Sequence, residues 1–231
     1  MAGKIRNQRT MLQRNHIEPK KSSVSGMKAL AEQAERAERL ESLLGFEGSA
    51  ARLYFEEFAG MIKPGDEPEA GAGGFSFDFD GRNRRPPRDP VNALLSLAYS
   101  MLAKDLTIAC YAVGFDPYMG FYHQLRHGRP ALALDLMEPF RPLIADSAVL
   151  SAMNTRMVTE RDFLRAGASV ALTPAGRKGF FRAYELRMDS LVTHPLFEYR
   201  VSYRRLLEIQ VRLLARVIEG EIPAYPVFVT R

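Results

Sequence analysis

The sequence predicts an all-α fold, and three observations support this prediction. Segments dominated by Ala, Leu, Glu, Gln and Arg, which are strong helix formers, recur along the 231 residues. No convincing run alternates apolar and polar residues with the period of two that a half-buried strand needs. Glycine and proline occupy ten of the 27 positions in 64–90, which predicts a long flexible loop at about 64–89 between two helical parts.

The first 26 residues are polar and basic, with several serines and a proline before a strong helical pattern begins. We therefore expect a basic N-terminal segment, 1–26, followed by a helical domain, 27–231. Its first helix is expected over 27–44 and should end at Gly45, because glycine is common just past a helix C-terminus. A second helix should begin just past Gly48 and run to about Ile62.

After the loop, a long apolar helix is expected from Pro90 to Val113. Asp89 is a good N-cap because its carboxylate can accept a backbone N–H, and proline is well tolerated at the first helical position. A helix over 131–140 should be disturbed by Pro139 and Pro142. Further helices are expected near 146–154, where Ser147 begins the helix, near 159–165, where Thr159 caps it, and near 174–192 and 198–219.

The composition is that of an ordinary globular chain, with 46% apolar and 26% charged residues. The formal net charge of +5 and the pI near 9.4 suit a polyanionic partner. A single cysteine, Cys110, excludes an internal disulfide framework and a multi-cysteine zinc site. No apolar run approaches 18 residues and the N-terminus lacks the apolar core of a secretory signal, so we expect a cytoplasmic protein with no membrane partner.

Glu47 is the first candidate functional residue, because it lies between Gly45 and Gly48 at the expected start of a helix. A carboxylate there could simply stabilise the positive end of the helix dipole. The flanking glycines favour a second explanation, since small residues around one carboxylate allow a backbone or a ligand to come close.

His123 follows two aromatic residues in a segment that contains two of the four histidines. It could be a hydrogen-bonded core histidine or a metal ligand, and the segment alone leaves both explanations open. His127 lies between Arg126 and Gly128, and we interpret it as a residue of a solvated loop.

Asp135 and Glu138 lie three residues apart in an apolar run, so on a helix they share one face. A buried carboxylate needs a partner. Arg141 could pair with Glu138, which is a structural explanation, and a hard divalent cation is the catalytic one. Two or three carboxylates with one imidazole suit Mg²⁺ or Mn²⁺ better than zinc, and a metal among arginines points to phosphodiester chemistry.

Several blocks of the chain, taken in order, match one known family. The blocks are Lys4–Arg9, Gly45–Phe55, Arg82–Ser96, Gly114–Pro117, Gly120–His123, Gly128–Glu138, Arg141–Pro142 and Val201–Leu207. Together they resemble the helical catalytic domain of the CRISPR-associated integrase, the first CRISPR-associated protein family, which inserts new spacers into CRISPR arrays. The resemblance spans essentially the whole chain.

The resemblance implies a metal site made of Glu47, His123 and Glu138, with Asp135 beside it, that binds Mg²⁺ or Mn²⁺. It implies a metal-dependent DNA endonuclease and integrase. Such an enzyme joins the 3′-hydroxyl ends of spacer DNA to the CRISPR repeat by transesterification and acts on branched DNA.

The resemblance also implies a homodimer and a small ferredoxin-like partner, the second CRISPR-associated family. Family members place a β-rich domain before the helical one, and we expect this chain to lack that domain. An alternative is therefore a catalytically silent helical DNA-binding module that needs a separate β-rich domain.

Arginines are expected to hold the DNA backbone by binding its phosphates, which makes binding salt-sensitive and nearly independent of sequence. Any single arginine could instead be an ion-paired surface residue. The candidates are Arg82, Arg84, Arg85, Arg88, Arg204 and Arg205.

Overall fold

The computed structural model describes residues 1–63, 75–83 and 86–230. In these residues the helices are α1 (Ala2–Asn15), α2 (Lys21–Glu35), α3 (Leu40–Glu56), α4 (Pro90–Val113), α5 (Ala131–Met137), α6 (Ser147–Asn154), α7 (Pro174–Asp189) and α8 (Tyr203–Ile218). A π-helix, η2 (Arg141–Asp146), joins α5 to α6, and short 3-10 turns form η1 (Phe58–Met61) and η3 (Glu160–Asp162). The prediction of a helical protein is confirmed.

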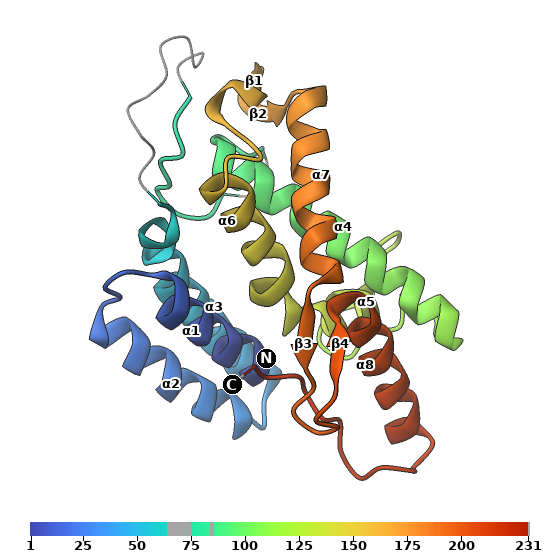
Figure 1. Cartoon of the computed structure of the whole chain (residues 1–231). Coiled ribbons are helices and arrows are strands. Elements are labelled where there is room, and N and C mark those ends of the chain that lie inside the picture. The colour runs from blue at the N-terminus through green and yellow to red at the C-terminus, as the bar shows by residue number, and fades with distance from the viewer. Residues whose placement is uncertain (64–74, 84–85, 231) are drawn as a thin grey trace.

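The helices form two groups around a central one. Helices α1, α2 and α3 pack on one another in chain order, and α4 crosses the molecule and contacts α5, α6, α8 and η2 (Figure 1). Helix α1 also packs on η2, so the N-terminal helices reach the middle of the fold. This packing brings α1 and α3 beside the segment that follows α5.

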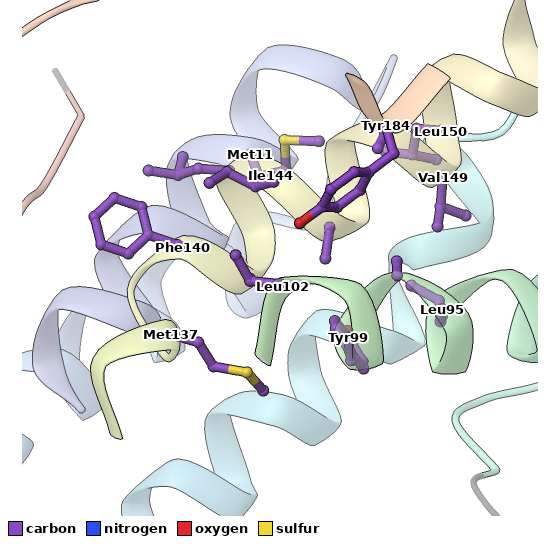
Figure 2. Close-up of a cluster of buried hydrophobic side chains, with 14 of the residues drawn as sticks. Met11, Leu95, Tyr99, Leu102, Met137, Phe140, Ile144, Val149, Leu150 and Tyr184 are labelled. Atoms are coloured by element: carbon purple, nitrogen blue, oxygen red, sulfur yellow. The ribbon is translucent and has the colours of Figure 1, made fainter. Parts of the chain in front are cut away.

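The core lies where α1, α4, η2, α6 and α7 meet. Figure 2 shows Met11 of α1, Leu95 and Leu102 of α4, Ile144 of η2 and Tyr184 of α7 gathered there, and all five side chains are buried. Burying an aliphatic or aromatic side chain contributes about 1.5–3 kcal/mol, so this cluster fixes how the elements cross.

Residues 1–26, the expected basic segment, contribute α1 and the beginning of α2. Ile5 and Leu12 of α1 are fully buried in the core. Asn7 ties α1 to two distant segments, because its amide donates to the carbonyls of Pro139 and Phe228. In return its Oδ1 accepts the N–H of Thr230.

The expected break at Gly45 is wrong. Helix α2 ends at Glu35, four residues without proline or glycine follow, and α3 then continues through both Gly45 and Gly48. A glycine in a helix costs about 1 kcal/mol relative to alanine. Burial of Ala50 and Tyr54 on the same helix outweighs this cost.

Two helix starts agree with their predicted caps. The Asp89 side chain accepts the N–H of Asn92, with Pro90 at the first helical position of α4. Thr159 and Asp162 form a reciprocal capping box, although the turn between them is a single 3-10 turn rather than the expected helix over 159–165.

Two antiparallel hairpins are present that the sequence did not predict. Strands β1 (Phe163–Ala166) and β2 (Ser169–Leu172) pair around Gly167, whose positive φ of 63° suits the turn. Strands β3 (Leu191–Thr193) and β4 (Arg200–Ser202) pair in the ends of the segments expected to be helical over 174–192 and 198–219. Strands of three or four residues are too short to show a clear period of two.

The expected loop at about 64–89 lies partly outside the described residues. In its described part, Phe75, Phe77 and Phe79 are half-buried against the core while the residues between them are exposed. The phenylalanines thus alternate with exposed polar residues because they pack against the core. Residues 75–80 pair with no strand among the described residues.

Helix α4 is long and apolar enough to cross a membrane by length and composition alone, contrary to the expectation from the sequence. One face of it packs into the core, with Leu94, Leu95, Leu102 and Leu106 completely buried, while Ile108 and Tyr111 near its C-terminus are exposed.

Candidate metal site

The candidate residues Glu47, His123 and Glu138 come from three separate segments that meet beside α1. Glu47 lies in the middle of α3, not at the start of a helix as expected. Glu138 directly follows α5 and is 3% exposed, while His123 lies in the irregular segment between α4 and α5. Helix α5 ends at Met137 with Glu138 as its C-cap residue, so Glu138 lies at the junction between α5 and η2.

Lys4 of α1 joins the two glutamates. Its Nζ lies 2.5 Å from Oε1 of Glu47 and 2.7 Å from Oε2 of Glu138, and the lysine is 3% exposed. An unpaired buried charge lowers the stability of a fold. Here the buried Lys4 ammonium pairs with both carboxylates at once. A single cation therefore already bridges the two predicted ligands.

Glu138 has a second cationic partner. Arg141 lies one turn later, and its Nη1 is 3.1 Å from Oε1 of Glu138. Burial acts to raise the pKa of Glu138, but the charges of Lys4 and Arg141 outweigh burial and lower the pKa to about 2. Glu138 is consequently ionised near neutral pH, as a metal ligand must be.

His123 is held by Asp135, the additional acid expected beside the site. Nδ1 of His123 is 2.6 Å from Oδ1 of Asp135, and the carboxylate also accepts the backbone N–H groups of Phe121, Tyr122 and His123. Burial raises the pKa of Asp135, yet the hydrogen bonds from the His123 ring and these N–H groups together lower it. The ring nitrogen Nε2 then faces Glu138, 3.9 Å from its Oε1.

A glycine allows the His123 segment to close on α5. A Cβ on Gly120 would lie 2.7 Å from Cβ and 2.8 Å from the carbonyl carbon of Ala131, the first residue of α5. Only a residue without a side chain fits this approach. The position of His123 thus depends on Gly120 as well as on Asp135.

A buried polar network holds Arg141, the second cationic partner of Glu138, in place. The Arg141 guanidinium stacks over the Tyr99 ring at 4.1 Å, and the Tyr99 hydroxyl donates to Oδ1 of Asp146 at 2.7 Å. Tyr54 of α3 donates to the other oxygen of Asp146 at 2.9 Å. Burial raises the pKa of Asp146, partly offset by these hydroxyls and by Arg141. Helices α3 and α4 are thus tied to the π-helix that carries Arg141.

The donor set fits a hard divalent cation. Two carboxylates and one imidazole with a fixed tautomer are ligands that Mg²⁺ and Mn²⁺ accept. In the part of the chain that the structure describes, no three such side chains converge on one point at coordination distance. The Lys4 ammonium instead lies between Glu47 and Glu138, which shows that this place accommodates a positive charge.

The two glycines that flank Glu47 in the sequence are exposed. A Cβ on Gly45 or on Gly48 would meet nothing within 4 Å. A groove of about 690 Å³ begins at Gly48 and runs between α3 and the residues Phe79–Arg82. The two glycines therefore serve no close packing among the described residues, in keeping with the prediction that a ligand approaches here.

The predicted DNA-binding arginines fall into different settings. Arg82 donates to Asn92 and Ser96 and lies over Tyr99, so it has partners within the chain. Arg88 is exposed. Arg204 and Arg205 are exposed and paired with acids of α7 and α8. Arg84 and Arg85 lie outside the described residues.

Lys4 is the site residue that sequence reasoning missed. In the sequence it stands out only as one of several basic residues near the N-terminus and as part of the block Lys4–Arg9. Its partners, Glu47 and Glu138, are distant in the chain, and no local pattern reveals such pairs. The place of Lys4 in a block of family resemblance is the one available signal.

Comparison with known proteins shows which protein family the chain matches. Residues 1–186 match the family model described as CRISPR associated protein Cas1. The chain is 53% identical over 237 residues to a CRISPR-associated exonuclease Cas4/endonuclease Cas1 fusion of Geobacter sulfurreducens, covering 100% of this chain and 42% of that protein. It is 45% identical over 232 residues to CRISPR-associated endonuclease Cas1 3 of Thermus thermophilus, covering 99% of this chain and 64% of that protein.

A solved structure has the same fold. A chain of a partial Cas6-RT-Cas1–Cas2 complex superposes with a TM-score of 0.83 at 26% identity, covering 100% of this chain and 66% of that one. The chain thus spans roughly two fifths to two thirds of the length of the proteins it matches.

Proposed function

Because this chain belongs to the Cas1 family of CRISPR-associated proteins, we propose that it is a metal-dependent DNA endonuclease and integrase of CRISPR adaptation. The observation that carries the proposal is that Glu47 and Glu138 share the buried Lys4 ammonium, while Nε2 of His123 lies 3.9 Å from Oε1 of Glu138. The names of the relatives, which are endonucleases, support the reaction class.

Glu47, His123 and Glu138 would hold Mg²⁺ or Mn²⁺. The bound ion would neutralise the negative charge that develops on the phosphate oxygens during the reaction. Asp135 accepts the Nδ1 proton of His123 and so keeps Nε2 available as a ligand atom. Arg141 keeps Glu138 ionised, and the network of Tyr99 and Asp146 fixes Arg141.

The proposed reaction joins a DNA 3′-hydroxyl to the CRISPR repeat. The hydroxyl oxygen forms a new bond to phosphorus and gives its proton to solvent. The bond from phosphorus to the adjacent nucleotide's oxygen breaks, and that oxygen takes up a proton and leaves as a free hydroxyl. DNA supplies the nucleophile, so no serine or cysteine of the chain is needed. The one cysteine, Cys110, is buried, and burial raises the pKa of its thiol to about 11, which suits a core residue.

We place the whole protein in a complex with DNA, as a cytoplasmic homodimer with a small ferredoxin-like partner. The superposed structure is a chain of a partial Cas6-RT-Cas1–Cas2 complex, which supports a Cas2 partner. Arg88, Arg204 and Arg205 are exposed, and we propose that they bind phosphates, with Arg204 and Arg205 exchanging their acidic partners for DNA. Replacing one phosphate-binding arginine by alanine should make the plot of log binding constant against log salt shallower by about 0.9 on duplex DNA.

Strand transfer and cleavage of branched DNA test the proposal, with Mn²⁺ or with EDTA. We expect wild-type activity to require metal and to be lost in Glu47→Ala and Glu138→Ala. Glu41→Ala is the matched control, because Glu41 lies on the same helix as Glu47 and its side chain is 76% exposed. Metal-dependent activity that survives in Glu138→Ala would refute the assignment.

If the wild-type chain is silent alone, the same assay is repeated with a β-rich Cas1 domain added in trans. Recovered activity that again requires Glu138 supports the proposal. Continued silence, with DNA binding intact, would favour the binding module instead.

A further inference from the structure

Lys4 is the cation nearest to both predicted carboxylate ligands. Its Nζ bonds to both, at 2.5 and 2.7 Å, and its side chain is 4% exposed. Glu138 also pairs with Arg141, but among the described residues Lys4 is the only side-chain cation within 4 Å of the Glu47 carboxylate. The Lys4 ammonium therefore occupies the place between Glu47 and Glu138 where a metal ion bound by both carboxylates would lie.

Lys4 and Arg141 compensate the charge of the two predicted carboxylate ligands. The buried Glu138 and the partly buried Glu47 would repel each other if no cation lay between them. Lys4 supplies one positive charge, and Arg141 supplies a second on the far side of Glu138. With both cations present, neither glutamate is left as an unpaired buried charge.

The backbone of Lys4 is fixed, whereas its ammonium is carried on a flexible stem. Asn7, one turn later on α1, is anchored to Pro139, Phe228 and Thr230. A lysine ammonium can move on its four-carbon chain while the helix stays in place. Withdrawal of the ammonium thus needs no rearrangement of α1.

We propose that Lys4 is the resident counter-cation of the metal-free site, and that a divalent cation binds by displacing its ammonium from between Glu47 and Glu138. This inference rests on the metal site of the proposed function. Lys4 then weakens metal binding while it stabilises the metal-free fold. A purely structural ion pair would have the opposite effect on affinity, because its loss would disorder the ligands.

The test measures Mn²⁺ binding to the full chain by titration calorimetry, in wild type, Lys4→Gln and Lys4→Arg. We expect Lys4→Gln to bind Mn²⁺ at least about tenfold more tightly, which corresponds to ~1.4 kcal/mol. Lys4→Arg keeps the charge and should bind no more tightly than wild type. Lys28→Gln is the matched control, because the Lys28 side chain is 65% exposed, and it should leave binding unchanged.

Thermal melting of the same variants gives a second readout. Without metal, Lys4→Gln should melt below wild type, and Mn²⁺ should raise its melting temperature by more than it raises that of wild type. Equal or weaker Mn²⁺ affinity in Lys4→Gln would overturn the inference. A Lys4→Gln chain that folds only with Mn²⁺ supports it, and one that fails to fold even with Mn²⁺ overturns it.

Glu138→Gln separates this inference from the proposed function. If Glu138→Gln binds Mn²⁺ as wild type does, the metal site itself is wrong. If Glu138→Gln loses binding while Lys4→Gln equals wild type, the metal site stands and the role of Lys4 is wrong.

Discussion

Nδ1 of His123 lies 2.6 Å from Oδ1 of Asp135, and the same carboxylate accepts three successive backbone N–H groups. Asp135 therefore fixes both the ring tautomer and the path of the segment that carries the ring. The residue identified from sequence as an additional acid beside the site is the one that orients the imidazole.

Asp135→Asn should weaken Mn²⁺ binding by about 10–100-fold, because removing an outer partner of a histidine ligand typically costs that much. The amide keeps a similar shape but loses the charge that holds the Nδ1 proton. Calorimetric titration measures the change. Asp116→Asn is the control, since Asp116 also accepts a backbone N–H, from Tyr118, in an exposed turn; equal losses in both variants would contradict the role of Asp135.

Gly48→Ala should stabilise the chain while impairing DNA joining. The new Cβ meets nothing within 4 Å, and alanine is better than glycine in a helix by about 1 kcal/mol. Gly48 follows Glu47 on α3 and lines the groove against Phe79–Arg82, where the new methyl group would obstruct a DNA strand lying in that groove. Urea unfolding and strand transfer are measured together, with Ser42→Ala on the same helix as control. Higher stability with unimpaired joining would exclude close approach at Gly48.

Tyr99→Phe should destabilise the fold by about 1–3 kcal/mol, because it removes a hydroxyl donor from the buried Asp146 carboxyl. Tyr99→Phe keeps the ring that stacks on Arg141, whereas Tyr99→Leu removes it. Tyr99→Leu should therefore bind Mn²⁺ more weakly than Tyr99→Phe does. Urea unfolding measures the first effect. Tyr111→Phe is the control, since Tyr111 is 59% exposed. A Tyr99→Phe chain as stable as wild type would show that the network does not support the site.

The unfolding free energy of the chain should depend on the ionisation of Glu57, which joins the end of α3 to the beginning of α2. Burial acts to raise the pKa of Glu57, but hydrogen bonds from Ser23 and the Lys20 N–H, with the Lys20 charge, lower it below 4.5. A lowered pKa means that ionised Glu57 stabilises the fold above pH 4.5 and that this contribution disappears as the pH falls through the lowered value.

Glu57→Gln tests this directly. Wild type should exceed the variant in unfolding free energy at pH 7, and the difference should shrink as the pH is lowered below 4.5. Chemical denaturation over this range measures it, with Glu56→Gln on the exposed side of α3 as control. A difference that stays constant with pH would contradict the assignment.

Local chemistry predicted several helix boundaries. Asp89 with Pro90 starts α4 as expected, because caps act within a few residues. The helix expected over 131–140 ends at Met137, ahead of Pro139, so the proline correctly marked a disturbance but not the boundary. Residue types alone suggest the candidate ligands, and the family resemblance is what places them together.

Long-range effects account for what was missed. Helix α3 passes through Gly45 and Gly48 because Tyr54 and Ala50 are buried against distant segments, and this packing overrides the weak propensity of glycine. The pairing of Lys4 with Glu47 and Glu138 depends on α1 crossing η2, which no local pattern encodes.

Electron spin-echo spectroscopy of Mn²⁺ bound to the chain tests the central claim most directly, because it detects nitrogen coordinated to the ion. The account predicts coupling from one imidazole that disappears in His123→Asn and persists in His127→Asn. Nitrogen coupling that survives in His123→Asn, or bound Mn²⁺ with no nitrogen coupling in wild type, would contradict a site formed by Glu47, His123 and Glu138.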